Sequence, residues 1–339
     1  MMGLWDTLRN LVVRKFTQAR SSQDLVFSDN QLALLQHPPT PPIQLRYCPA
    51  LGKKPASNAA SQASEKPKKA FDPFESPAPE LLIAQVPATN PSHNLVLNKY
   101  PVIFNHFILA TKENKPQTDV LEEDDLYLTY AALQAWKQDA VGQQGHSLFA
   151  FFNSGEHSGA SQPHRHLQFL PIEDMKGEDH DGWQVLCETM ISPAHKSLPL
   201  LHNPSLTFVH FATSLQPGLG AAGLHQKYLL LMRAALASIS EGRDLESLNA
   251  VSISHDRRTT FSYNLAMTTE VMAILPRRAE ASAIPGVANS SIAINGTILA
   301  GTMMVKAEEE WHSLCEQPQH VQKILNDITY PRMHDVLRD

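Results

Sequence analysis

The chain has 339 residues, of which 42% are hydrophobic and 18% are charged, a composition typical of a globular protein with a large buried core. Its net charge of −6 gives no general attraction for nucleic acid, so we expect no nucleic-acid partner. No apolar run approaches the roughly 20 residues that a membrane helix needs, so we expect no membrane partner either.

The N-terminal region, residues 1–50, is predicted to contain a helix and strands. Apolar residues recur at helical spacing between positions 1 and 22, which predicts a docked amphipathic helix and not a secretory signal. Residues 51–79 are rich in Lys, Pro, Ala and Ser, which predicts an exposed, mobile loop. For its lysines a solvated surface charge is the default interpretation: Lys53, Lys54, Lys68 and Lys69.

Alternating and helical patterns continue through the rest of the chain. The expected strands are 94–98, 106–111, 147–153, one beginning at His164, 249–254, 262–267, 270–275, 291–294 and 298–305. The expected helices are 126–139, 221–240 and 307–328, and 173–183 is an expected loop. This order is no strict βαβ repeat. It predicts an α+β fold with a mainly antiparallel sheet and flanking helices.

Three cysteines lie far apart and form no C-x-x-C motif: Cys48, Cys187 and Cys315. Neither a disulfide framework nor a zinc site is therefore expected. Free thiols favour a reducing compartment, so we expect the cytoplasm, with the nucleus open as a further location.

One motif stands out, His164-x-His166-x-Gln168, which lies between a small-residue loop and an apolar run. The alternation predicts a strand, and side chains of a strand have a period of two. The three polar side chains would therefore share one face. Six other histidines are predicted to be core residues that make one hydrogen bond: His93, His106, His146, His157, His210 and His225.

The loop before these histidines is predicted to bind phosphate. Gly155 and Gly159 have no Cβ, so backbone N–H groups of the loop can approach a ligand closely. Asn153 is interpreted as a phosphate-binding or loop-shaping group, and Ser161 as a phosphate contact in preference to a simple turn residue. The candidate residues of this loop are Asn153, Ser154, Gly155, Gly159, Ala160 and Ser161.

The pattern Asn-x-Gly-x-x-x-Gly-x-Ser-x-x-His-x-His-x-Gln resembles the active-site signature of the nucleotidyltransferase branch of the histidine-triad superfamily. That branch contains galactose-1-phosphate uridylyltransferases and diadenosine tetraphosphate phosphorylases. Its members have Gln at the third triad position, where hydrolases of the superfamily have His, and this chain has Gln168. Flanking segments resemble the phosphorylases, over 44–49, 72–74, 91–100, 106–113, 262–268 and 276–277.

The resemblance implies a histidine-triad-like fold with two related halves. Residues 80–200 would form the catalytic half, and residues 201–339 the half that completes the nucleotide site. His166 would be the nucleophile, because an imidazole nitrogen forms a reactive phosphoramidate. His164 would orient it. Gln168 would donate to a phosphate oxygen of the covalent intermediate, since a neutral amide cannot act as a general base.

The resemblance also implies substrate-binding residues outside the motif. Lys99 and Arg277 are candidate cations for a polyphosphate chain, and Asn94 and Asn264 are candidates for phosphate or ribose hydroxyls. Two neighbouring residues complete this set, Met267 and Thr268. We expect no metal held by the protein and no covalently bound cofactor. Mg²⁺ or Mn²⁺ would accompany the polyphosphate, since Mg²⁺ is usually bound through phosphates with few protein ligands.

The implied activity is phosphorolysis of diadenosine tetraphosphate to ATP and ADP through an adenylyl-histidine, with reverse synthesis and a sulfate-dependent exchange of the ADP-sulfurylase type. The partners would be dinucleoside polyphosphate, ATP, ADP and phosphate, and a monomer is favoured. One alternative is a hexose-1-phosphate uridylyltransferase, which the missing cysteine pair disfavours. Another is a non-catalytic nucleotide-binding protein, which would not need the complete set of His164, His166 and Gln168.

Overall fold

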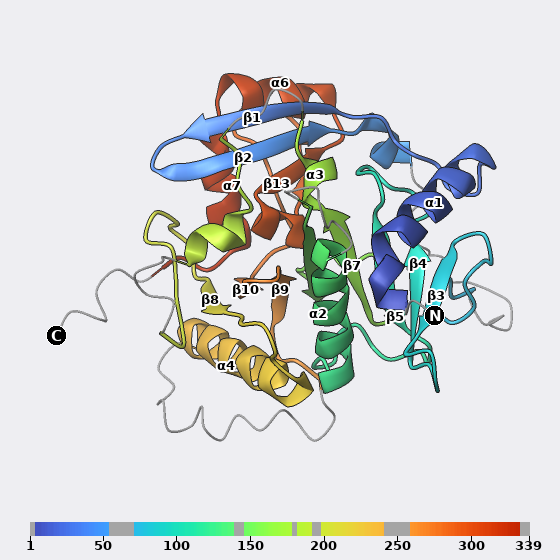
Figure 1. Ribbon diagram of the computed structural model, residues 1–339. Helices are drawn as coiled ribbons and strands as arrows, with labels where there is room; N and C mark the ends of the chain where they lie inside the picture. The colour runs from blue at the N-terminus through green and yellow to red at the C-terminus, as the bar shows by residue number, and fades with distance from the viewer. Residues whose placement is uncertain are drawn as a thin grey trace, which may run out of the picture.

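An eight-stranded antiparallel sheet forms the centre of the protein, in the order β3-β4-β5-β7-β6-β9-β10-β8 (Figure 1). The computed structural model describes residues 4–53, 71–138, 146–177, 182–191, 198–240 and 258–332. The strands are β3 (Leu82–Val86), β4 (His93–Leu97), β5 (Phe107–Thr111), β6 (Leu148–Ser154), β7 (His166–Pro171), β8 (Phe211–Ser214), β9 (Ser262–Met267) and β10 (Val271–Arg277). Because β6 pairs with both β7 and β9, the sheet continues from one half of the chain into the other.

Two long helices cover one face of this sheet (Figure 1). They are α2 (Glu123–Gln138) and α4 (Ala221–Ile239). In the core beneath them Phe107 stacks on Phe169, with ring centroids 4.6 Å apart, and on Trp136 at 5.9 Å. Since Leu167 and Phe169 of β7 point into this core, the alternate side chains, those of His166 and Gln168, point to the opposite face of the sheet.

A second, smaller sheet crosses the top of Figure 1, beside α6 and α7. Its strands are β1 (Gln31–His37), β2 (Thr40–Tyr47) and β13 (Thr302–Val305). Strands β1 and β2 are antiparallel, whereas β13 runs parallel to β2 and so joins the two ends of the chain. The remaining short elements are η1 (Leu4–Thr7), η2 (Pro49–Lys53), α3 (Ile172–Met175), η3 (Leu186–Met190), β11 (Ala281–Ser282), β12 (Ile292–Ala293), η5 (Gly296–Ala300), α6 (Glu308–Glu316) and α7 (His320–Ile328).

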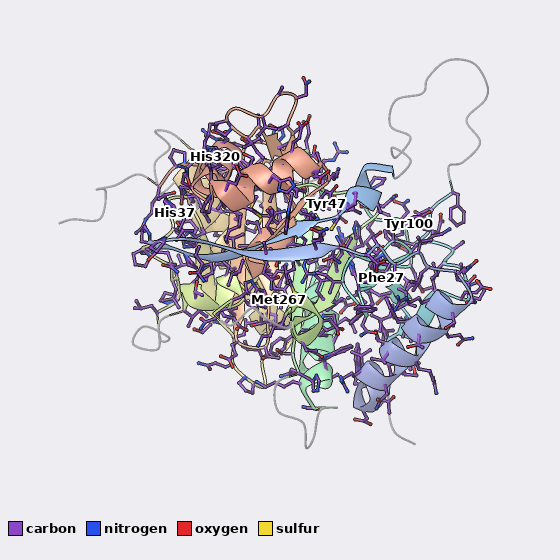
Figure 2. The ribbon with its side chains drawn as sticks, turned by 90° about the horizontal axis from the view of Figure 1, so that it is seen from above. Phe27, His37, Tyr47, Tyr100, Met267 and His320 are labelled. Atoms are coloured by element: carbon purple, nitrogen blue, oxygen red, sulfur yellow. The ribbon has the colours of Figure 1, made fainter. Side chains whose placement is uncertain are left out.

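The N-terminal helix α1 (Leu8–Ser21) docks on the protein as predicted. Its buried residues are Leu8, Val12, Phe16 and Ala19, which recur at the helical spacing. The ring of Phe16 meets Phe27 at 6.4 Å and Phe104 at 5.9 Å. Seen from above, Phe27 lies on the side of the molecule that carries α1 (Figure 2).

Several predicted elements differ from the structure. The expected helix 307–328 is divided into α6 and α7 around Pro318, which lacks a backbone N–H donor and cannot continue a helix. The expected strand 298–305 begins as the 3-10 helix η5, and the expected loop 173–183 begins within the short helix α3. The expected strand 249–254 lies outside the described residues.

The predicted fold class is confirmed, because the protein is an α+β fold with a large antiparallel sheet and flanking helices. No helix among the described residues is both long and apolar enough to span a membrane.

The docking of α1 can be tested at Phe16, which is 3% exposed. Replacement Phe16→Ala should lower the free energy of unfolding by about 3 kcal/mol or more, since it removes a large ring from a packed core. Denaturation in urea measures this change. The exposed Gln18 on the same helix provides the control, and Gln18→Ala should change stability by less than about 0.5 kcal/mol. Equal effects of the two changes would show that α1 is not docked.

Candidate active site

His166 is the first residue of β7 and is 2% exposed. Its Nδ1 lies 2.8 Å from the backbone oxygen of His164. A carbonyl oxygen can only accept, so Nδ1 carries the proton and donates it. In a neutral ring Nε2 then has the free lone pair. Among the described residues, none forms a hydrogen bond with this Nε2.

The surroundings of His166 keep its ring neutral. Burial is the largest cause and lowers the pKa of His166 from 6.5 to about 4, while the hydrogen bond to the His164 carbonyl opposes it. Near neutral pH the ring is therefore unprotonated at Nε2. A buried imidazole of this kind is suited to attack phosphorus, because no proton must leave before it reacts.

His164 is held at both ring nitrogens. Its Nδ1 lies 2.7 Å from Oδ2 of Asp72, and its Nε2 lies 2.7 Å from the backbone oxygen of Thr111. These two partners hold the ring from both sides and fix its orientation. His164 precedes β7 and forms an isolated bridge with Pro116. The ring of Phe74 contacts both histidines, with centroids 5.7 Å from His164 and 4.9 Å from His166.

Asp72 and Phe74 are site residues that the sequence prediction placed within the mobile loop 51–79. Residues 71–79 are instead ordered against the sheet, whereas 54–70 lie outside the described residues. The Asp72 carboxylate accepts from Phe74 N at 2.9 Å and from Asn114 Nδ2 at 2.7 Å. Burial raises the pKa of Asp72, but the Phe74 amide and the His164 ring outweigh it and lower the pKa below 3.8. The resemblance of 72–74 to the family was the available signal.

Gln117 is a second residue that sequence analysis missed. Its Oε1 accepts from the backbone N–H of His166 at 2.8 Å. Its Nε2 donates to the backbone oxygen of Asn153 at 2.8 Å and to that of His166 at 3.2 Å. One buried amide therefore joins the start of β7 to the end of β6, which fixes the backbone that carries His166. No sequence pattern marks Gln117.

Asn153 and Asn264 are brought together across β6 and β9. Oδ1 of Asn153 accepts from Asn264 Nδ2 at 2.9 Å and from Gly296 N at 2.8 Å. Its Nδ2 is buried and has no hydrogen-bond partner among the described residues. An unsatisfied buried donor is costly, so this N–H group is a candidate to meet a ligand oxygen.

Arg277, a predicted candidate cation for a polyphosphate chain, is buried among oxygen atoms of the protein. The side chain is 1% exposed, and each of its three nitrogens donates to an oxygen of another described residue. NH1 donates to Asn264 Oδ1 at 2.6 Å and to Ile294 O at 2.8 Å, and NH2 donates to Ala279 O at 2.9 Å. The remaining bonds go to Glu280 O and Ile328 O. With its fork of donors occupied, Arg277 instead holds Asn264 in place.

The structure gives a different reason from the predicted one for glycine at two positions of the loop. Gly155 and Gly159 have φ of +88° and +77°, a conformation that other residues rarely adopt. A Cβ on Gly155 would lie 2.4 Å from Ser262 Oγ, and one on Gly159 would lie 2.9 Å from Ile294 O. Close packing within the protein therefore requires both glycines, whatever ligand approaches the loop.

The other candidate residues of the loop form no hydrogen bond with His166 among the described residues. Ser154 is buried, and its hydroxyl lies 3.3 Å from that of Thr259. Ala160 is half-buried and Ser161 is exposed. Gln168 is half-buried on the face of His166, and its Oε1 lies 3.1 Å from Nε2 of His106. The structure thus brings His164, His166 and Gln168 to one face of the sheet, as the alternation predicted.

Three of the further candidates take part in contacts within the protein. Asn94 donates to Phe74 O at 2.9 Å and so holds the ring that packs on the histidines. Met267 packs in the core beneath the helices, on the face opposite to Asn264, and lies near the middle of the view in Figure 2. The Thr268 amide donates to Val271 O and closes the turn between β9 and β10. Lys99 is exposed, with its ammonium 5.8 Å from the Tyr100 ring centroid.

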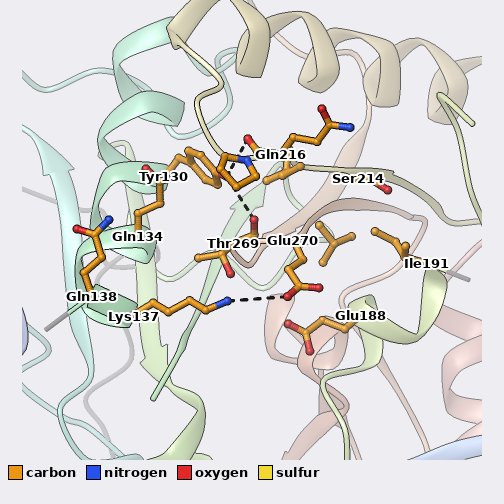
Figure 3. A pocket seen from close by; sticks show the side chains of 13 residues that line it. Tyr130, Gln134, Lys137, Gln138, Glu188, Ile191, Ser214, Gln216, Thr269 and Glu270 are labelled. Atoms are coloured by element: carbon orange, nitrogen blue, oxygen red, sulfur yellow. Dashed lines mark hydrogen bonds and ion pairs between the residues drawn. The ribbon is translucent and has the colours of Figure 1, made fainter. Parts of the chain in front are cut away.

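A pocket of about 640 Å³ lies at the turn between β9 and β10, beside the end of α2 (Figure 3). At its wall the single hydroxyl proton of Tyr130 is shared between Gln216 O at 3.2 Å and Thr269 O at 3.3 Å, and Lys137 pairs with Glu270 at 3.9 Å. None of the histidines of the motif lines it. This pocket is therefore a different place in the structure from the group of side chains around His166.

A metal site is not evident in the part of the chain that the structure describes, since it contains no group of three or more His, Cys, Asp or Glu side chains able to hold an ion.

Two family models match the chain. The Ap4A phosphorylase N-terminal domain matches residues 4–183, and the ATP adenylyltransferase C-terminal domain matches residues 204–331. Diadenosine 5',5'''-P1,P4-tetraphosphate phosphorylase 2 of Saccharomyces cerevisiae is 29% identical and the alignment covers 96% of this chain and 95% of that protein. Crystal structures of yeast Ap4A phosphorylase Apa2 are also similar. One has a TM-score of 0.74 at 25% identity, covering 96% and 98% of the two chains. The complex with AMP has 0.73 at 25% identity, covering 97% and 98%.

The neutral state of His166 can be measured by NMR of protein with isotope-labelled histidine. The His166 signal is assigned as the one that disappears in His166→Ala, and we expect it to titrate with a midpoint of about 4. The unfolded chain binds this proton near pH 6.5 and the folded chain does not, so the stabilising contribution falls as pH decreases from about 6.5 toward 4. A midpoint near 6.5 would show that the ring is not buried as described.

The role of Arg277 can be tested by Arg277→Met, which keeps the stem and removes the guanidinium. We expect the free energy of unfolding to fall by about 3 kcal/mol or more, because several buried oxygens lose their donors. Arg233→Met provides the control, since Arg233 is exposed on α4. Urea denaturation compares the two. Unchanged stability of Arg277→Met would contradict the structural role.

Proposed function

The chain belongs to the Ap4A phosphorylase family, and from this we propose that it cleaves diadenosine tetraphosphate with inorganic phosphate to give ATP and ADP. The full-length similarity to a yeast diadenosine tetraphosphate phosphorylase supports the substrate, and that to Apa2 bound to AMP supports an adenylate subsite. The observation that carries the proposal is the buried, neutral imidazole of His166 with its Nε2 lone pair free of partners among the described residues.

The first step is attack of His166 Nε2 on the phosphorus next to one adenosine. A bond forms between Nε2 and this phosphorus while the bond from phosphorus to the bridging oxygen breaks, and ATP leaves with the bond's electron pair. The ring gains positive charge as the adenylyl group is attached. The hydrogen bond from Nδ1 to the His164 carbonyl stabilises that charge, because the Nδ1 proton becomes a stronger donor.

The second step consumes the adenylyl group. An oxygen of inorganic phosphate attacks phosphorus, the Nε2–P bond breaks, and ADP forms while His166 returns to its neutral state. Gln168 lies two residues from His166 on the same face, where its side chain can contact the phosphoryl oxygens. An amide neither activates water nor supplies a proton, which favours phosphate over water as acceptor. The reverse reaction and exchange with other anions follow from the same intermediate.

Donors to the phosphoryl oxygens come from groups that lack a hydrogen-bond partner among the described residues. The buried Asn153 Nδ2 is one, and its Oδ1 is held by Asn264 and Gly296, so its donor side is fixed. Donors placed in advance stabilise developing charge without reorganisation. A divalent cation such as Mg²⁺ would enter with the polyphosphate as part of the substrate, held mainly by phosphate oxygens.

Replacement of the nucleophile tests this proposal. In His166→Ala, turnover of diadenosine tetraphosphate should fall by at least about a thousandfold, while binding of the substrate persists. Intact-protein mass spectrometry after incubation without phosphate should detect an adenylyl adduct on the native protein and none on the variant. His225→Ala on α4 serves as the histidine control and should keep both. Turnover of His166→Ala within tenfold of the native rate would reject His166 as nucleophile.

A further inference from the structure

Behind Gln168 lies a chain of two polar side chains that the proposed chemistry does not use. Nε2 of His106 is 3.1 Å from Gln168 Oε1, and Nδ1 of His106 is 3.0 Å from Asn98 Nδ2. His106 is 8% exposed, just before β5, and Asn98 follows β4. Neither residue contacts His166 in these hydrogen bonds.

The backbone sets the direction of this chain. Oδ1 of Asn98 accepts from the backbone N–H of Tyr100 at 2.9 Å. An N–H group can only donate, so the oxygen of the Asn98 amide must face Tyr100 and its NH₂ group must face His106. Nδ1 of His106 is then an acceptor, and in the neutral ring the proton lies on Nε2.

The orientation of the Gln168 amide follows in the same way from the tautomer of His106. Nε2–H of His106 donates, so the atom of Gln168 that faces it is the oxygen Oε1. The NH₂ group of Gln168 is thereby turned away from His106. Without such a partner, the terminal torsion of a glutamine has two nearly equivalent settings that exchange oxygen and nitrogen. In one of them the oxygen would face the phosphoryl group and repel it.

We propose that Asn98 and His106 are positioning residues that hold the Gln168 amide with its NH₂ group toward the phosphate oxygens of the adenylyl group that His166 transfers. This inference rests on the proposed function for the identity of the transferred group. It explains why a buried histidine outside the motif faces the oxygen of the half-buried Gln168. His106 acts through Gln168 and has no contact with substrate in this scheme.

The tautomer of His106 gives a test that needs no catalysis. ¹⁵N NMR of histidine-labelled protein should show Nε2 protonated and Nδ1 unprotonated in the native protein. In Asn98→Leu, which removes the donor to Nδ1, this preference should weaken. A native ring protonated at Nδ1 alone would overturn the proposal, whatever the activity of the protein.

A kinetic double-mutant cycle tests the action through Gln168. The readouts are the rate of adenylyl-histidine formation at saturating diadenosine tetraphosphate, by rapid quench without phosphate, and the Kd of the same substrate. His106→Leu should lower the rate about tenfold or more and change Kd by less than about threefold. The reason is that a Gln168 amide turned the wrong way no longer donates to the phosphate oxygens, and this hydrogen bond stabilises the transition state more than the bound substrate. In the Gln168→Ala background the same change should alter the rate less than about twofold.

Two further variants complete the cycle. His106→Gln places an amide N–H near the position of Nε2 and should recover most of the rate, whereas His312→Leu, on the exposed face of α6, should have no effect. Asn98→Leu should lower the rate less than His106→Leu, and it replaces that variant if the buried substitution prevents folding. Equal losses with and without Gln168 would reject the relay. Absence of any adduct on the native protein would reject the proposed function, and the tautomer would still decide the relay.

Discussion

The hydrogen bond from His166 Nδ1 to the His164 carbonyl is the constraint on which the site depends. It assigns the proton to one nitrogen and leaves the lone pair on the other, and burial keeps the ring in that state at neutral pH by lowering its pKa. The bond requires the backbone just before β7 to hold a set conformation. That conformation is stabilised by the His164 ring between Asp72 and Thr111, and by Gln117 at the His166 amide.

The opposite face of the same segment is anchored by charge. Arg165 is 1% exposed, and its NH1 lies 3.0 Å from Asp125 in the first turn of α2 and 3.2 Å from Glu122 just before that helix. A buried guanidinium is tolerated only with such partners, so β7 cannot shift relative to α2 without separating them. Asp125 also meets His93 of β4 at 2.9 Å. The residue between the two histidines of the motif therefore fixes the strand to the helix layer.

The C-terminal part of the chain supports the site from the other side. Arg277 holds Asn264, Asn264 holds Asn153, and Asn153 lies near the end of the strand that pairs with β7. The bond between Asn264 and Asn153 joins the region matched by one family model to the region matched by the other. Because the donors and acceptors in this series are buried, loss of one leaves its neighbour unsatisfied. The two regions thus form one structural unit around His166.

The sequence by itself determined the α+β class, most helices and strands, and the facing of His166 and Gln168, because these follow from local periodicity. It did not determine the position of the helix break at Pro318, or the hydrogen-bond partners of Asp72, Gln117 and His106. These three residues reach their partners across 92, 49 and 62 positions of the chain. The contacts of Arg277 could not be predicted from the sequence either. A basic residue in this segment was interpreted as a phosphate ligand, and only the structure showed that its donors meet buried protein oxygens. Only the packing of strands and loops decides which buried oxygens a donor meets, and this is set by tertiary structure.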